Sequence, residues 1–212
     1  MHTRSFPAKA GNDGYAGTLA SIKKKKKKRM QLFNFFRKNK KKSDKSDEEI
    51  LKSKICLKPI NQKVENEILQ INWSNLKTAY GNAEKTIPNY LRNIYCTDKE
   101  IAMEAAHQLW CSLCHQHSYI STASLMSYEI IRNRLIECDD KLKVELLDIF
   151  YGFTCCTNHK TKDEEYQQLL KKMKLKLLKD KEIFINLARH KDEDVNSFAE
   201  LILEGLENKK EN

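Results

Sequence analysis

The chain has 212 residues, with 39 Lys and Arg against 29 Asp and Glu, and a formal net charge of +10. Apolar residues make up 40% of it, and no run approaches the roughly 20 apolar residues of a membrane-spanning helix, which excludes a polytopic membrane protein. The charge is uneven, because residues 1–58 hold 18 basic and 5 acidic groups, whereas residues 59–212 hold 21 and 24. The basic excess therefore belongs to the N-terminal part, and the remainder is slightly acidic.

Residues 1–29 have no periodic apolar pattern and end in Lys23 to Lys28 and Arg29, directly before Met30. We expect a disordered basic extension here, because nothing in it can pack a core. Such a lysine run is typical of a nucleic-acid-binding or localisation arm. The alternative is a mis-assigned start, since a Lys-run, Arg, Met string resembles a translated purine-rich ribosome-binding site.

Residues 30–58 form an aromatic and basic segment followed by a charged linker. Four apolar residues in 32–36 precede Arg37, Lys38 and Lys40 to Lys42, a pattern that predicts weak contact of residues 30–42 with an anionic membrane. Ser46 and Glu49 match a capping box, which predicts a short helix after them.

Residues 59–212 are expected to form an all-α domain, because their apolar residues recur at spacings of three and four and glycine and proline are sparse. No hairpin dipeptide separates alternating runs, so sheet is not expected. Thr97 with Glu100 and Thr161 with Glu164 match capping boxes. The predicted helices cover about 61–80, 84–95, 98–114, 119–137, 140–156, 163–188 and 192–207.

Seven cysteines at irregular spacing, with no apolar stretch of a secretory signal, predict free thiols and a cytoplasmic location. Buried, core-filling thiols are the simplest role for them.

A repeat is visible in three of the predicted helices. Asp98, Asp139 and Asp192 are each followed by apolar residues at +3, +7 and +11, and the repeats start 41 and 53 residues apart. We expect each Asp to cap a helix and each stripe to pack inward. The first spacing falls within the HEAT period, and helix pairs of this kind stack into an α-α superhelix. The alternative is an ordinary helical bundle in which the apolar stripes of three amphipathic helices have the same spacing by coincidence.

One stretch also resembles a known family. The residues concerned are Trp73, Leu76, Ala79-Tyr80-Gly81, Ile87-Pro88, Leu91, Ala105, Leu109-Trp110, Leu113, His115-Gln116, Tyr119 and Thr122-Ala123. They are similar to bacterial HEAT-repeat-like proteins of the armadillo-type superhelix class. The resemblance implies a partner-binding scaffold and names no enzyme, and some such proteins serve as immunity proteins beside toxins. His117 stands where that family has glycine, which leaves the tightness of the turn open, although His tolerates positive φ better than most residues.

Cys111-Ser-Leu-Cys114-His115 has the spacing for covalent haem attachment. The absence of a signal peptide argues against haem, and we expect no cofactor. Cys111, Cys114, His115 and His117 also offer zinc ligands, with Cys96 or His107 as substitutes, but no second ligand pair exists. Cys114 beside a histidine, or Glu104 with Glu137, supplies the residue types of catalysis without a demonstrable geometry. We therefore predict no metal and no enzyme, and expect His115, Gln116 and His117 to organise a turn between helices.

The positions off the apolar stripes of the three Asp-led helices form the predicted partner-binding surface, a concave groove if the helices stack as in HEAT repeats. Five of these eight positions are acidic, which favours a basic protein partner over nucleic acid. The alternative function is nucleic-acid binding through the basic tail, and an ordinary solvated face remains open. The surface consists of Glu100, Glu104, His107, Lys141, Glu145, Asp148, Asp194 and Phe198.

Overall fold

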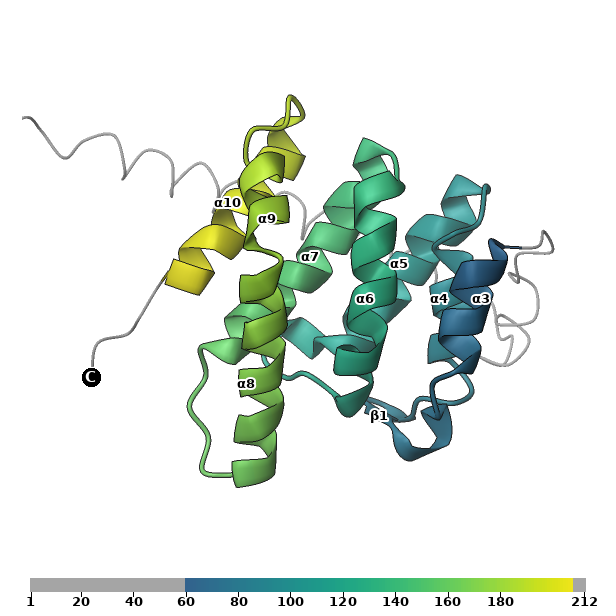
Figure 1. The fold of residues 1–212 in the computed structure, drawn as a ribbon, viewed down its shortest axis with the longest axis vertical. Helices are drawn as coiled ribbons and strands as arrows, with labels where there is room; N and C mark the ends of the chain where they lie inside the picture. The colour runs from purple at the N-terminus through teal and green to yellow at the C-terminus, as the bar shows by residue number, and fades with distance from the viewer. Residues whose placement is uncertain (1–59, 208–212) are drawn as a thin grey trace, which may run out of the picture. The chain divides into compact units, whose positions relative to one another are not determined.

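The computed structural model divides the chain into two units, residues 1–49 and 50–212, and describes residues 60–207, which belong to the second. Eight α-helices make up most of these described residues (Figure 1), so the predicted all-α class is confirmed. The predictions for residues 1–58 lie outside the described residues. Among residues 60–207, no helix combines the length and the apolar character needed to cross a bilayer.

The described elements follow one another with short connections. They are α3 (Gln62–Leu69), η1 (Trp73–Asn75), β1 (Lys77–Thr78), β2 (Gly81–Asn82), α4 (Ile87–Asn93), α5 (Lys99–Leu113), η2 (His115–His117), α6 (Thr122–Glu137), α7 (Asp140–Thr157), α8 (Glu164–Lys179), α9 (Lys181–Leu187) and α10 (Glu193–Glu207).

The helices form two layers (Figure 1). Helices α5, α7 and α10 pack side by side in one layer, with α7 in the middle. Helices α3, α4, α6, α8 and α9 make up the other layer, in which α6 contacts both α4 and α8. Across the layers α4 packs on α5, α6 and α8 pack on α7, and α9 packs on α10. The three Asp-led helices predicted from the repeat are therefore the members of one layer.

Aspartates cap these helices as predicted. Asp98 accepts hydrogen bonds from the backbone N–H groups of Glu100 and Ile101, Asp139 accepts one from Leu142, and Asp192 accepts them from Asp194 and Val195. Each carboxylate satisfies N–H groups that the first helical turn leaves free. The two predicted capping boxes are wrong, because Asp98 and Asp163 cap α5 and α8 in place of Thr97 and Thr161.

Aromatic rings fill the centre of the core. Tyr128, Phe150, Phe153 and Phe184 are all fully buried, and Phe150 of α7 contacts the other three with centroid separations of 5.2 to 6.0 Å. Phe150 is the +11 residue of the second repeat, so the predicted stripe does face the core. Buried rings of this size stabilise the fold chiefly by the apolar area that they remove from water.

Two predicted helices have different boundaries in the structure. The helix predicted over 61–80 ends at Leu69, and β1 and β2 follow as a two-residue antiparallel pair, so the expectation of no hairpin is wrong. Gly81 makes this turn possible, since its φ of +124° is accessible mainly to glycine. The helix predicted over 163–188 is interrupted at Asp180, whose non-helical ψ separates α8 from α9.

The cysteines only partly follow the prediction. Cys111, Cys114, Cys138, Cys155 and Cys156 are free thiols, whereas Cys96 takes part in a disulfide. The expectation of free thiols throughout is therefore wrong at Cys96. Burial raises the pKa of Cys138 to about 11 and that of Cys156 to about 12, so both stay protonated at neutral pH.

An ion pair joins α3 to α4 and gives the fold a measurable pH dependence. The Arg92 guanidinium donates to both carboxylate oxygens of Glu65, with Nε–Oε2 at 2.9 Å and a terminal nitrogen 2.7 Å from Oε1. The hydrogen bonds from Arg92 hold the pKa of Glu65 below its ordinary 4.5. The pair therefore stabilises the fold fully above pH 4.5, and the contribution is lost as the pH falls through the lower folded pKa.

We expect Glu65→Gln to lower the free energy of unfolding by about 1 kcal/mol at pH 7, because the pair is bidentate and three-quarters buried. The loss should shrink towards zero at acid pH, where the wild-type carboxylate is itself neutral. Urea unfolding at several pH values measures this. Glu67→Gln is the control, since Glu67 forms no ion pair within residues 60–207; an equal loss in both variants, or one independent of pH, would contradict the assignment.

Candidate functional site

The predicted partner-binding residues occupy equivalent positions on three neighbouring helices. Counted from the capping Asp, position +2 holds Glu100, Lys141 and Asp194, which are all exposed. Position +6 holds Glu104, Glu145 and Phe198, and position +9 holds His107 and Asp148, which are all half-buried. Because α5 contacts α7 and α7 contacts α10, equal offsets bring these side chains to the same face of one layer.

Five rings form a continuous row across that face. The row consists of His107, Trp110, His117, Tyr151 and Phe198, and we call it the ring row. Successive centroids are 5.8, 5.4, 5.1 and 6.3 Å apart, and each ring is half-buried. The row starts on α5, passes through η2 to α7 and ends on α10. Such edge and stacked contacts stabilise one another and hold the side chains in defined positions.

Three members of the ring row, Trp110, His117 and Tyr151, are not among the predicted partner-binding residues, and His117 belongs to the predicted turn. Trp110 and Tyr151 belong to no site predicted from the sequence. Both stand at +12 from their capping Asp, the next position on the same helix face, and the equivalent residue of α10 is Glu204. Extending the repeat to position +12 would have pointed to Trp110, Tyr151 and Glu204.

His117 is the centre of the ring row and has an unusual backbone. Its φ of 58° makes it the non-glycine residue with positive φ among residues 60–207. Its Nε2 lies 2.9 Å from Trp110 Nε1 and 3.1 Å from Asp148 Oδ1. Because Trp110 can only donate and the carboxylate can only accept, a neutral Nε2 serves Trp110 and a protonated Nε2 serves Asp148. The same imidazole nitrogen can therefore join η2 either to Trp110 of α5 or to Asp148 of α7.

The predicted structural turn lies in η2. His117 N donates to Cys114 O at 2.9 Å and Ser118 N donates to His115 O, so backbone bonds close the turn. The side chains of His115 and His117 bind other side chains rather than the free ends of helices, since His115 Nδ1 lies 3.0 Å from the Tyr80 hydroxyl. Gln116 contributes its backbone to the turn.

The Cys-x-x-Cys-His motif ends α5 without forming a ligand set. Cys114 is fully buried, burial raises its pKa well above the ordinary value, and its Sγ lies 3.4 Å from Trp110 O. A buried, protonated thiol is a poor nucleophile and a poor metal ligand. Cys111 Sγ lies 3.5 Å from His107 Nε2. Within the part of the chain that the structure describes, no three His, Cys, Asp or Glu side chains are arranged to hold a metal ion.

The two helix layers differ in charge. Helices α5, α7 and α10 hold ten Asp and Glu against three Lys, a net of −7, and α10 contains no basic residue. Helices α3, α4, α6, α8 and α9 hold seven acidic and ten basic residues, a net of +3. The ring row therefore lies in the acidic layer, where the carboxylates of Glu104, Glu145 and Asp148 flank it along the helix faces.

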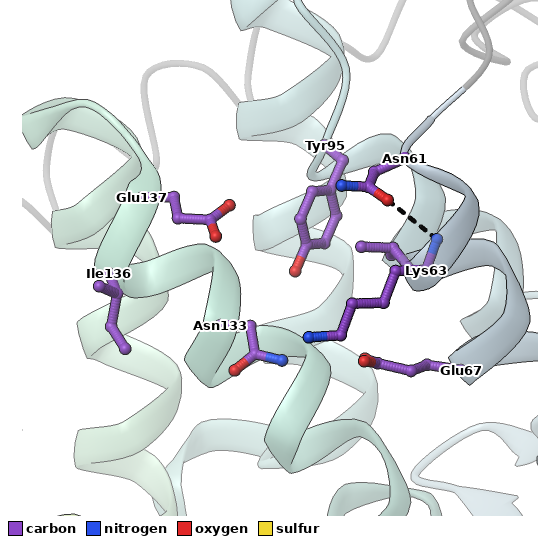
Figure 2. A pocket seen from close by; sticks show the side chains of 8 residues that line it. Asn61, Lys63, Glu67, Tyr95, Asn133, Ile136 and Glu137 are labelled. Atoms are coloured by element: carbon purple, nitrogen blue, oxygen red, sulfur yellow. Dashed lines mark hydrogen bonds between the residues drawn. The ribbon is translucent and has the colours of Figure 1, made fainter.

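Surface hollows lie elsewhere (Figure 2). One of about 190 Å³ lies between α3 and α6, where the Lys63 ammonium extends towards Asn133. Burial raises the pKa of the lining Tyr95, whose hydroxyl donates to Ile130 O at 2.9 Å. A second hollow beside Trp73 and Arg92 has a volume of about 290 Å³. Both are smaller than the roughly 300 to 1,000 Å³ of typical small-molecule sites, and no predicted partner-binding residue lines either.

Comparison of the chain with protein-family models, with curated proteins and with solved structures gives no match. What the chain binds therefore has to be inferred from its own side chains.

Gly152 allows η2 to approach α7 at the ring row. A Cβ at this position would lie 2.6 Å from Cys114 Sγ and 2.9 Å from His117 Cδ2. We expect Gly152→Ala to lower the free energy of unfolding by about 1 to 3 kcal/mol, because the added methyl group would overlap the fully buried Cys114 and the His117 ring, which the ring row holds in place. The measurement is urea unfolding, followed by the near-ultraviolet signal of Trp73 and Trp110.

The control is the double variant Gly152→Ala with Cys114→Ala, which removes the nearest contact. It should be less destabilised than the sum of the two single variants. A stabilised Gly152→Ala variant, the usual result for glycine inside a helix, would show that η2 does not depend on this close approach.

Proposed function

We propose that the chain is a non-catalytic protein-binding scaffold of HEAT-like helix pairs, an adaptor or immunity protein that binds a basic protein partner. The partner-binding surface is the face of α5, α7 and α10 that contains the ring row and the eight residues at positions +2, +6 and +9. The observation that carries the proposal is the row of five rings in a layer whose helices have a net charge of −7.

The packing supports the HEAT-like part of the proposal. α4 precedes and contacts α5, α6 precedes and contacts α7, and α8 with α9 precedes and contacts α10. The second helices of these pairs lie side by side, as in stacked α-α repeats. The positive φ of His117 supports the family resemblance, because the similar proteins have glycine at this position.

The chemistry of the face supports a protein partner that is basic. Aromatic side chains that cluster at half-buried positions are typical of the centres of protein interfaces. Carboxylates around them attract lysine and arginine side chains, speed association and repel anionic partners such as nucleic acids. Arginine side chains also bind favourably to aromatic faces, which this surface supplies.

The triple variant Glu100→Lys, Glu104→Lys and Glu145→Lys should weaken capture of a basic partner from the native cell at least about 10-fold, because it places like charges opposite one another. Capture is quantified by mass spectrometry, and the affinity for the identified partner is then measured at several salt concentrations. Higher salt should weaken the wild-type complex.

The matched control is Glu84→Lys, Glu164→Lys and Glu165→Lys, which changes the net charge by the same amount at exposed positions outside the acidic layer. It should retain the partner. If both triple variants, folded by circular dichroism, bind the partner equally well, the surface is not the one that we propose.

A further inference from the structure

The layer of α3, α4, α6, α8 and α9 has a net charge of +3, and we call it the basic layer. Its helix α8 has a second surface that the proposed partner-binding function does not use. From Tyr166 to Lys179 this helix has five lysines and no Asp or Glu. Its inner side is formed by the buried Leu170, Met173 and Leu177. The outer side of α8 consists of exposed residues that are three and four positions apart. We call this set the α8 stripe, and its members are Gln168, Lys171, Lys172, Leu175, Leu178 and Lys179.

The α8 stripe combines positive charge with exposed apolar side chains. Leu175 is 67% exposed and Leu178 is 42% exposed, so both leucines extend from the surface among the lysines. Lys176 is different, since it pairs with Glu129 at 2.8 Å and lies over the Tyr128 ring. Lys171, Lys172 and Lys179 form no ion pair within residues 60–207. Their charges are therefore available to an anionic partner.

We propose that the α8 stripe is a docking surface for an anionic lipid bilayer. Lysines around exposed leucines are the pattern of helices that lie in the membrane interface, with the apolar groups among the acyl chains and the ammonium groups at the headgroups. A nucleic acid backbone would use the lysines but would leave both leucines in water. The leucines therefore favour the bilayer over nucleic acid, and the lysines favour anionic over neutral lipid.

The same layer supports this assignment. α8 packs on α6 and α7 and lies at the front of the molecule in Figure 1. Its neighbour α6 exposes Met126, a further apolar side chain, at 45%. Of the acidic groups near α8, Glu129 binds Arg132 and Lys176, and Asp180 lies 3.8 Å from Arg132, whereas Glu164 and Glu165 in the first turn of α8 are exposed. The lysines of the α8 stripe lie C-terminal to these two glutamates, in the part of the helix that has no Asp or Glu.

The triple variant Lys171→Gln, Lys172→Gln and Lys179→Gln, made in the full chain, tests the lysines. Co-sedimentation with vesicles of equal parts phosphatidylserine and phosphatidylcholine gives the partition coefficient. We expect it to fall about 100-fold, since each lysine close to an anionic surface strengthens binding about five-fold. The wild-type chain and the triple variant both contain the lysines of residues 23–42, so these lysines do not account for a difference between the two partition coefficients.

The control for net charge is Lys63→Gln, Lys77→Gln and Lys85→Gln, three exposed lysines on α3, β1 and the loop before α4. It removes the same charge and should change the partition coefficient little. Equal losses in the two triple variants would overturn the proposal, because the binding would then follow total charge rather than the α8 stripe.

A position-specific probe tests the leucines. Tryptophan in Leu175→Trp should be quenched by brominated acyl chains in the same vesicles, after subtraction of the signal of Trp73 and Trp110, and tryptophan in Lys85→Trp should not. Quenching confined to position 175 supports docking through the α8 stripe. No quenching at position 175 would overturn it, even with the lysine effect present, and would assign the lysines to a water-soluble anionic partner.

Discussion

The burial of helix α7 holds the described part of the chain together, because α7 contacts helices of both layers. Its Phe150 joins the core rings of α6 and α9, while its Tyr151, one residue later, belongs to the ring row. Adjacent residues on a helix point in directions about 100° apart, so one turn of α7 contributes both to the core and to the ring row. The ring row is therefore attached directly to the core beneath it.

The sequence predicted the all-α class and most helices, because aspartate caps and apolar spacing are local signals. It failed at residues 70–82, where the chain turns back at Gly81, and at Asp180, which interrupts a continuous apolar pattern. The offsets from the capping Asp place the eight predicted residues at equivalent positions on three helices, but they did not point to Trp110 and Tyr151. The contacts that define the ring row join three helices across 91 residues, and no local pattern reports them.

His117 shows how a single residue combines backbone and side-chain roles. Its left-handed backbone closes the turn between α5 and α6, a task usually given to glycine. Glycine would lose the imidazole that contacts both Trp110 and Tyr151. The cost of a positive φ in a non-glycine residue is thus offset by two ring contacts and a hydrogen bond, which glycine could not provide.

The separation of charge between the two layers gives residues 60–207 an electric dipole that points from the acidic to the basic layer. In the field of a charged surface, a dipole experiences a torque before any contact forms. An anionic surface therefore turns the basic layer towards itself, and the layer that contains the ring row then faces the surrounding solution. A basic protein approaching from solution meets the opposite end of the same dipole, so the two encounters favour a single orientation of the domain.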